Sequence, residues 1–261
     1  MATADSAGPA RSGLTLTNWI PYLFFHTYFL SADSASSALN FYPFDFVWAM
    51  TLEPMETKIL KGDLQGIERA SRLILQGGLV AFPTETFYAL GADALNEQAI
   101  QKVYAMKGRD EGNPLLLLVA EKEWVPALVK ELPPAAEKLI ARFWPGPLTL
   151  VFETSSQVPA RLTGRTGKVG IRVPGHPLAR DLIRAVGRAV TGTSANPSGM
   201  PSASYAGEVI QTLGGKIDAV LDGGRTAGGL GSTVLDISGP SPVMVRQGVV
   251  PASELRAIFR E

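Results

Sequence analysis

The spacing of apolar residues changes repeatedly between a helical and an extended period from residue 57 onward. Apolar residues at every third or fourth position predict helices, and short continuous apolar runs predict buried strands. The expected helices cover residues 64–76, 97–107, 134–143, 178–186, 205–213 and 251–259. The expected strands cover residues 79–82, 115–119, 169–173, 189–191, 219–221, 233–236 and 243–246, with one more that ends at Phe152. Because strands and helices alternate, we expect an α/β (α+β) fold, a single domain with one twisted, mixed sheet flanked by helices.

Residues 79–119 form the unit around which the rest of the chain is organised. An apolar strand ends at Pro83, and Asn96 is placed to cap a helix that stops at Gly108. Residues 115–119 are apolar at every position, which is typical of a strand buried on both faces. Two strand ends and one helix end therefore bring polar side chains to one edge, where open α/β sheets place their ligands.

Residues 1–56 differ in composition from the remainder of the chain. The first ten residues are mostly small or polar, and an aromatic-rich segment at 19–30 is interrupted by Pro21 and His26. We expect a disordered leader, or upstream sequence before a true start at Met50 or Met55, followed by a folded domain over residues 57–261. A secretory signal peptide is the less favoured alternative, because Arg11 alone makes a weak basic start.

Composition narrows the class of protein. The 261 residues are 46% hydrophobic and 18% charged, which is enough apolar material for a sizeable core. The 24 basic and 24 acidic residues give zero net charge, so the chain as a whole does not favour a nucleic-acid or membrane partner. The sequence has no cysteine, which excludes disulfides and thiolate chemistry and fits a cytoplasmic location. No apolar run reaches the ~18 residues of a membrane span.

Several common catalytic and nucleotide-binding motifs do not occur in the sequence. Neither the P-loop pattern nor the dinucleotide-binding glycine pattern is found, and there is no G-x-S-x-G elbow. The segment from Gly228 to Thr233 resembles a phosphate loop without its lysine, and such loops are usually turns. With only two histidines, a Ser-His-Asp triad or a histidine-based metal site is not expected.

A set of cations and hydroxyls follows the predicted strand and helix ends instead. Many of these residues have ordinary structural explanations, since cations suit helix C-termini and Ser or Asn before Pro forms turns. Arg172 is less ordinary, because a charge within an apolar strand must face water or pair with an anion. A set with no nucleophile suits a polyanion such as a nucleotide triphosphate, with a reaction driven by positioning and charge stabilisation. The set comprises Thr84, Thr86, Lys107, Arg109, Asn113, Arg172, Ser194, Asn196, Ser232, Thr233 and Arg246.

Seven segments, in chain order, carry a resemblance to a known family. They are FPTETFYALGADA, KGRDEGNPL, FWPGPLTLVF, GIRVPGHPLA, TSANPSG, DGG followed by GSTVLD, and VRQG. In this order they resemble the YrdC domain of threonylcarbamoyl-AMP synthases, over about residues 57 to 260. The resemblance implies an α/β domain around a concave, positively charged cleft, in the short single-domain form of the family.

The resemblance also implies a reaction: L-threonine, bicarbonate and ATP give L-threonylcarbamoyl-AMP and pyrophosphate. Partner proteins would use this product to make N6-threonylcarbamoyladenosine in tRNA. The implied threonine contacts are Thr86, Arg172, Ser194 and Ser232. The implied ATP contacts are Lys107, Arg109, Asn113, Lys168, Asn196, Ser204 and Arg246, and the signature catalytic set is Lys107, Arg109, Ser194 and Asn196. Mg²⁺ would arrive with the ATP phosphates rather than in a protein cage.

Three positions depart from the family pattern as the resemblance presents it. Asp110 stands where a proline usually follows the Lys-x-Arg pair, Ala89 where a glycine is usual, and Leu118 where a histidine is often found. A carboxylate at position 110 would add negative charge near a triphosphate, which we expect to weaken ATP binding.

Two other functions remain open. The family's basic cleft has been associated with double-stranded RNA, so a non-catalytic RNA-binding protein is one alternative, although zero net charge argues against broad phosphate binding. A paralogue that handles another carbamoyl-adenylate, like the related domain of hydrogenase maturation proteins, is the other. That relative normally belongs to a longer chain with zinc fingers, and this sequence has no cysteines to form them.

Overall fold

The computed structural model describes residues 56–259, and the predicted leader lies outside these residues apart from Glu56. The helices in this range are α1 (Leu64–Leu75), α2 (Glu97–Lys107), α3 (Val125–Leu128), α4 (Pro134–Phe143), α5 (Pro177–Val186), α6 (Ala206–Leu213) and α7 (Ala252–Ile258), with a 3₁₀ turn at Lys122–Trp124. The strands are β1 (Lys58–Lys61), β2 (Val80–Pro83), β3 (Tyr88–Gly91), β4 (Leu116–Leu118), β5 (Leu148–Glu153), β6 (Lys168–Arg172), β7 (Val190–Thr191), β8 (Thr193–Ser194), β9 (Ala219–Asp222), β10 (Thr233–Asp236) and β11 (Val243–Arg246). The mixed α/β class is confirmed.

The strands form two mixed sheets, where the sequence predicted one. The first sheet has the order β1-β9-β2-β3-β8 and the second has the order β11-β10-β5-β6-β4-β7. Each sheet contains both parallel and antiparallel pairs, for example β2 with β9 and β2 with β3. The prediction merged the sheets because β7 and β8, which belong to different sheets, are separated in sequence by Gly192 alone.

The chain passes from one sheet to the other at Gly192. Leu118 Cγ lies 2.5 Å from the position that a Cβ would take on Gly192, so a side chain there would overlap the core. On either side of Gly192 the backbone stays paired, since Thr191 N donates to Ala92 O at 2.9 Å and β8 pairs with β3. A residue without a side chain therefore allows two sheets to share one continuous segment.

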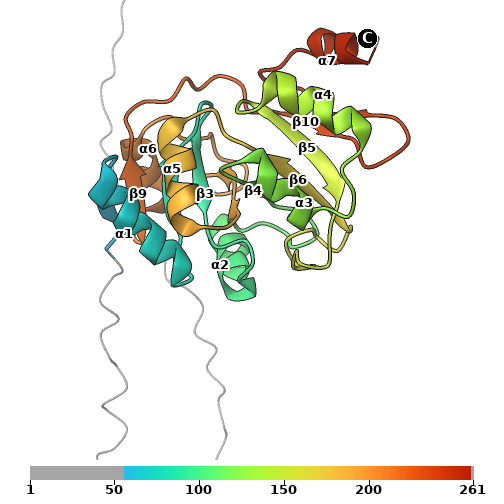
Figure 1. Ribbon diagram of the computed structural model, residues 1–261. Helices are drawn as coiled ribbons and strands as arrows, with labels where there is room; N and C mark the ends of the chain where they lie inside the picture. The colour runs from blue at the N-terminus through green and yellow to red at the C-terminus, as the bar shows by residue number, and fades with distance from the viewer. Residues whose placement is uncertain (1–55, 260–261) are drawn as a thin grey trace, which may run out of the picture. The chain divides into compact units, whose positions relative to one another are not determined.

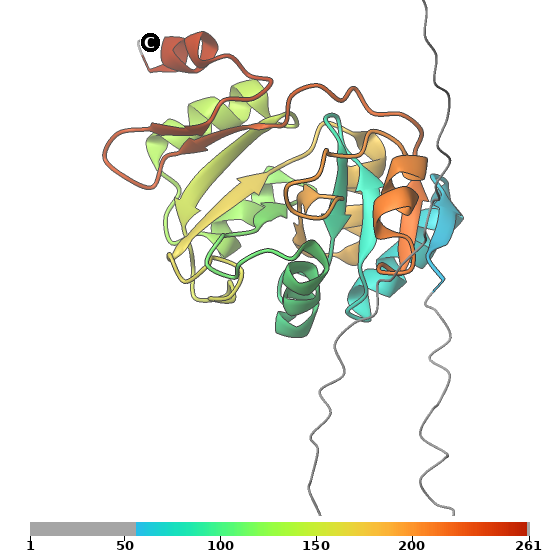
Figure 2. The same cartoon turned by 180° about the vertical axis from the view of Figure 1, so that it is seen from behind.

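Side-chain alternation places the first sheet between two apolar layers. Val80 and Phe82 belong to one buried cluster, while Ala81 between them belongs to the other. Helices α1 and α5 lie side by side on the first of these faces (Figure 1), and α6 covers the opposite face (Figure 2). Strands β2, β3 and β9 are thus buried on both faces, which explains why they are apolar almost throughout.

Local capping agrees with the predicted helix boundaries. Asp63 Oδ1 accepts a hydrogen bond from Gly66 N at 2.9 Å at the start of α1, and the Asn96 side chain accepts from two backbone N–H groups at the start of α2. Gly108 ends α2 in the left-handed conformation, with φ of 58°, which glycine adopts without strain. Helix α2 therefore ends at Lys107, one of the predicted site residues. No helix within residues 56–259 has the length and apolarity to cross a membrane.

Candidate functional site

One face of the second sheet is the floor of a cavity of about 630 Å³. Alternate residues of β5 and β6, such as Leu150 and Ile171, point into the apolar core beside α4. Their neighbours point the other way, because successive side chains of a strand leave on opposite faces. The floor is formed by Leu116, Val151, Lys168, Gly170, Arg172, Val234 and Asp236. Arg172 is therefore carried to the cavity by the alternation of an otherwise apolar strand.

The first sheet provides the opposite wall of this cavity. Thr84 and Thr86 lie in the turn between β2 and β3, and their hydroxyl oxygens are 3.1 Å apart. Thr193 and Ser194 of β8 also line the cavity. Both threonines are buried, and the Thr84 hydroxyl donates to Phe87 O at 2.7 Å and accepts from Thr86 N at 3.3 Å, so it stabilises the turn itself. The Thr86 hydroxyl, whose contact is with Thr84, is the one placed to meet a bound molecule.

A second cavity of about 570 Å³ lies at the C-terminal end of α2. It is lined by Lys107, Gly108, Arg109, Asp110, Asn113, Thr193, Ser194, Asn196, Ser198, Gly199, Met200 and Ser202. Four of these residues, Arg109, Thr193, Ser194 and Ser202, also line the first cavity. The two cavities are therefore adjacent, with a guanidinium and three hydroxyls on the wall between them.

Lys107 ties the end of α2 to the loop that follows β8. Its Nζ donates to Ser194 O at 2.6 Å, Asn196 O at 2.7 Å and Asn196 Oδ1 at 3.2 Å. Ser194 Oγ in turn donates to Asn196 Oδ1 at 2.6 Å. Burial, and secondarily the charge of Arg109, lower the pKa of Lys107 to about 8. The signature lysine thus holds the Ser-x-Asn pair in place, with its positive charge at the cavity wall.

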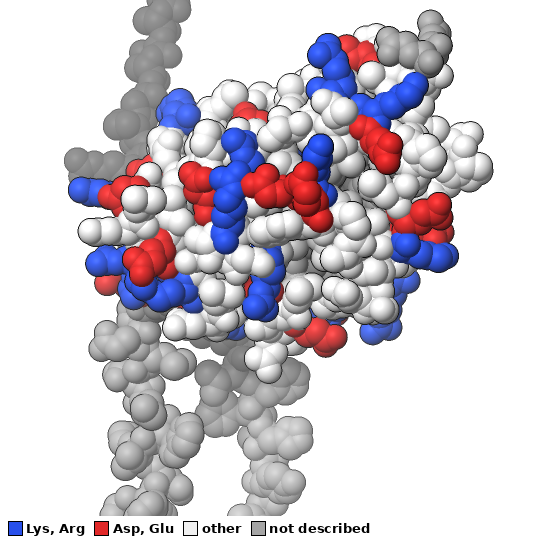
Figure 3. All heavy atoms as spheres, viewed as in Figure 1, with Lys and Arg blue, Asp and Glu red and all other residues white. Residues whose placement is uncertain are grey.

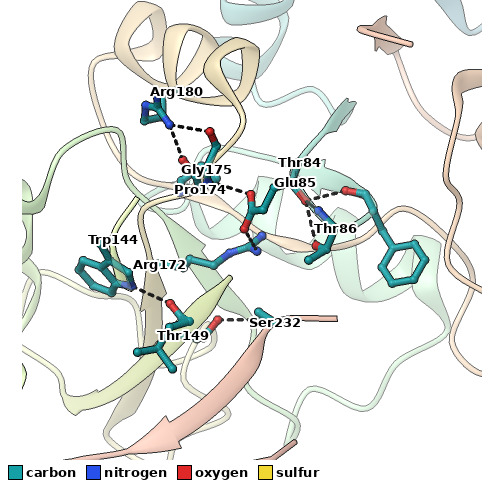
Figure 4. Close-up of polar contacts among 12 residues, drawn as sticks. Thr84, Glu85, Thr86, Trp144, Thr149, Arg172, Pro174, Gly175, Arg180 and Ser232 are labelled. Atoms are coloured by element: carbon teal, nitrogen blue, oxygen red, sulfur yellow. Dashed lines mark hydrogen bonds and ion pairs between the residues drawn. The ribbon is translucent and has the colours of Figure 1, made fainter. Parts of the chain in front are cut away.

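Among residues 56–259, Arg172 is paired at one guanidinium nitrogen only. Its Nη1 donates to Glu85 Oε1 at 2.7 Å, and Glu85 Oε2 accepts from Gly175 N at 2.8 Å (Figure 4). Burial lowers the pKa of Arg172, and the Glu85 carboxylate opposes that shift. The remaining guanidinium N–H groups have no hydrogen-bond partner among residues 56–259 and are not sealed from solvent. They are free to bind an anion in the cavity.

Arg246 and Ser232 form a second polar group at the cavity. Arg246 Nη2 donates to Ser232 O at 2.8 Å and to Ser232 Oγ at 3.1 Å. Ser232 Oγ also lies 3.0 Å from the Thr149 hydroxyl (Figure 4). The position of Arg246 in β11 is fixed by β10, its antiparallel neighbour.

Lys168 is paired with an acid that lines the same cavity. Its Nζ lies 3.0 Å from Asp236 Oδ2 across the sheet. Burial alone would raise the pKa of Asp236, but hydrogen bonds from Ser238 and the Lys168 ammonium lower it overall. The Asp236 carboxylate therefore partly neutralises the positive charge of Lys168.

The cavities concentrate positive charge that the chain as a whole lacks. Five cations line them (Lys107, Arg109, Lys168, Arg172 and Arg246), against the two carboxylates of Asp110 and Asp236. The face in Figure 3 contrasts with this, since its lysines and arginines are interspersed with acidic side chains. Positive charge is thus focused at the site, which favours a small polyanion over an extended one.

The structure brings together ten of the eleven residues that the resemblance implies, and Thr84 also lines the first cavity. Thr233, predicted from its place near a strand end, lines neither cavity, because it is buried and its hydroxyl donates to Val250 O at 2.8 Å. Thr86, Lys168, Arg172, Ser232 and Arg246 line the first cavity, Lys107, Asn113 and Asn196 the second, and Arg109 and Ser194 both. Ser204 lines neither cavity; its backbone N donates to Glu208 Oε2, and its carbonyl accepts from Thr226 N. Ser202 lines both cavities and was not predicted. The sequence offered no means to choose between the two serines, which flank buried Ala203.

Glu85 was also missed as part of the site. It lies between two threonines that were predicted, and its carboxylate is directed to Arg172 rather than into either cavity. The only sequence signal would have been the need of a buried arginine for a counter-ion.

The departures from the family pattern fall in different surroundings. Asp110 Oδ1 accepts from Gly112 N at 2.6 Å, so this carboxylate stabilises its own turn at the edge of the second cavity. Leu118 is buried in the core against Gly192, and Ala89 lines the first cavity.

Comparisons with known proteins place this chain in a family. The Sua5/YciO/YrdC family model, described as "Telomere recombination", matches residues 72–248. A Pyrococcus abyssi protein named threonylcarbamoyl-AMP synthase is 44% identical over 75% of this chain and 57% of its own length. A Bacillus subtilis protein of the same name is 40% identical over 74% of this chain and 56% of its own length. The chain therefore spans a little over half the length of these relatives.

The fold is also similar to solved structures. A crystal structure of P. abyssi Sua5 complexed with L-threonine superposes with a TM-score of 0.75 and 41% identity, covering 78% of this chain and 60% of that one. The helices and strands described above are thus arranged as in that protein.

Proposed function

The chain belongs to the Sua5/YciO/YrdC family, and on this basis we propose that it is an L-threonylcarbamoyladenylate synthase. The reaction is L-threonine + bicarbonate + ATP → L-threonylcarbamoyl-AMP + pyrophosphate. Two relatives that share 40–44% of aligned residues bear this name, and a related structure contains L-threonine. As a nucleotidyltransferase of this kind, the protein would supply an activated carbamate to partner proteins that modify tRNA to N6-threonylcarbamoyladenosine.

One observation carries the proposal beyond the names of relatives: two cavities share a wall that contains Arg109 and Ser194. The reaction joins an amino acid to a nucleotide, so it needs two subsites that meet where the new bond forms. The first cavity has the N–H groups of Arg172 that Glu85 does not use for a carboxylate, and the Thr86 hydroxyl for a polar group. The second cavity has Lys107 and Asn113 and suits the nucleotide phosphates.

The chemistry requires no protein nucleophile. The threonine amine attacks the bicarbonate carbon and water leaves, which gives a carbamate. A carbamate oxygen then attacks the α-phosphorus of ATP, and the bond from that phosphorus to the bridging oxygen breaks as pyrophosphate leaves. Negative charge shifts onto the phosphate oxygens in this step, and Arg109, with the Lys107 charge behind it, stabilises that charge.

Magnesium does not fit this site as a resident cofactor. No cluster of three or more His, Cys, Asp or Glu residues occurs within residues 56–259, and of the two cavity carboxylates Asp236 is paired with Lys168. Mg²⁺ would enter with the triphosphate, which prefers to bind it through its own oxygens. No step above depends on a protein-bound metal.

The direct test is isotope incorporation by the full-length protein. With L-threonine, ATP and ¹³C-bicarbonate, mass spectrometry should detect threonylcarbamoyl-AMP heavier by one mass unit than with ordinary bicarbonate. L-threonine replaced by D-threonine is the matched control and should give no product. An AMP-containing product that carries no bicarbonate label would contradict the proposal and indicate another adenylating reaction.

A further inference from the structure

Glu85 does not line either cavity, but it pairs with Arg172, which lines the first cavity. Its carboxylate joins two elements, with one oxygen 2.7 Å from Arg172 Nη1 and the other 2.8 Å from Gly175 N (Figure 4). The Glu85 side chain is 20% exposed and the Arg172 side chain 6%. A carboxylate held at both oxygens has little freedom, so it fixes the direction from which Nη1 is approached.

The backbone turn at residues 174–175, which Glu85 contacts, also accepts hydrogen bonds from helix α5. Arg180, on α5, donates from Nη1 to Pro174 O and to Gly175 O, each at 2.9 Å (Figure 4). The Pro174 carbonyl belongs to the same peptide group as the N–H that is donated to Glu85, and the Gly175 carbonyl belongs to the next peptide group. The contacts therefore form a series from α5 through the turn and Glu85 to the guanidinium in the cavity.

Without Glu85, Arg172 would have other interactions open to it. Asp236 is a carboxylate that lines the same cavity, and it is paired with Lys168 alone among the cations of residues 56–259. The positive charge of Arg246 acts on Arg172 and repels it. A guanidinium released from Glu85 would lose its only ion-pair partner among residues 56–259 and would still be repelled by Arg246, so the direction of its N–H groups toward the amino-acid subsite would no longer be fixed.

We propose that Glu85 is a positioning residue for recognition of the substrate carboxylate, with Arg180 as its outer support. This inference rests on the proposed function, because the carboxylate in question is that of L-threonine. Glu85 touches Arg172 and not the reacting atoms, so its effect should fall on threonine binding rather than on the chemical step. Orientation of a charged donor is sensitive to small displacements, and its loss typically costs on the order of 10- to 100-fold.

The test compares Glu85→Gln with Glu68→Gln in steady-state pyrophosphate release by the full-length protein. Both substitutions neutralise a glutamate 2.7 Å from an arginine, but Glu68 pairs with Arg72 on the exposed surface of α1. Glu85→Gln should raise KM for L-threonine roughly 10- to 100-fold, with kcat lowered less than about threefold and KM for ATP unchanged. Glu68→Gln should alter none of these. A fall in kcat at unchanged threonine KM, or a lower threonine KM, would overturn the positioning role.

A second pair of variants decides the matter if Glu85→Gln does not fold. Arg180→Ala removes both hydrogen bonds to the turn and should raise the KM for L-threonine severalfold. Arg180→Lys retains a hydrogen-bond donor and should bring this KM most of the way back to the wild-type value. Equal threonine KM in the two variants and the wild type would overturn the inference. Inactivity of the wild-type protein would instead refute the proposed function, so the two failures are distinguishable.

Discussion

At the scale of single residues, the cations of the site have different tasks. Among residues 56–259, Arg109 donates only from Nη2, to Pro114 O, and Arg172 only from Nη1, to Glu85. The Lys107 ammonium, in contrast, donates to three acceptor oxygens of the Ser-x-Asn loop. Lys107 therefore contributes charge and loop geometry together, and Arg109 contributes direct hydrogen bonds.

The role of Arg109 predicts a loss in the chemical step. Arg109→Ala should lower kcat/KM for pyrophosphate release by about 30-fold or more, which corresponds to ~2 kcal/mol of lost electrostatic stabilisation. Arg72→Ala is the matched control, since Arg72 forms an exposed ion pair on α1. An unchanged rate for Arg109→Ala would remove this residue from the site.

The lowered pKa of Lys107 predicts a pH dependence of ATP affinity. Since this pKa is about 8, the ammonium is the major form below pH 8 and the neutral amine above it. The dissociation constant of ATP should rise by about twofold from pH 7 to 8, where half of the ammonium is deprotonated, and then by up to about tenfold per pH unit. Calorimetric titration measures the dissociation constant of ATP directly. L-threonine and bicarbonate are left out of this measurement because their own ionisation would add to the pH dependence.

Lys107→Arg provides the control for this pH dependence. Arginine keeps its charge throughout the range, so its ATP affinity should not vary with pH even if its absolute value is lower. A rise of equal steepness in this variant would assign the titration to another group.

At the scale of elements, the longer helices were predictable because their signals are local, whereas the four-residue helix α3 was missed. Asp63, Asn96 and Gly108 act at the positions where capping rules place them, and α4, β10 and β11 have the predicted bounds. Strands β1, β3 and β8 were missed. Strand β3 follows the polar PTET turn so closely that its four apolar residues seemed part of the loop, and β8 has only two residues.

The site was predictable to the extent that strand ends and alternation determine it. Alternation along β6 accounts for Arg172, and the end of α2 accounts for Lys107. The roles of Ser202 and Glu85 depend on tertiary contacts that no local pattern encodes. Ser194 reaches both cavities because the chain changes sheet at Gly192, a division that the sequence pattern did not reveal.

The passage of the chain between the two sheets at Gly192 gives a prediction at the scale of elements. Gly192→Ala would place a methyl group against Leu118 in the core, and we expect it to lower the free energy of unfolding by about 1–3 kcal/mol. Chemical denaturation measures this change. Because the two residues share the space, the Gly192→Ala/Leu118→Ala double variant should lose less than the sum of the single variants. Strict additivity would show that the overlap is relieved elsewhere.

At the scale of the whole molecule, a chain of zero net charge gathers five cations around two joined cavities. A bound substrate should therefore stabilise the fold. At an L-threonine concentration 100 times its dissociation constant, the free energy of unfolding should rise by about 2.7 kcal/mol. D-threonine at the same concentration is the control, and equal stabilisation by both would indicate a nonspecific solute effect.

The central claim is that this site couples threonine, bicarbonate and ATP in one reaction. The most direct measurement is pyrophosphate release from ATP by the full-length protein, with each co-substrate omitted in turn. The account predicts release only when L-threonine and bicarbonate are both present. Release in the absence of either, or no release by a folded protein that binds ATP and L-threonine, would contradict it.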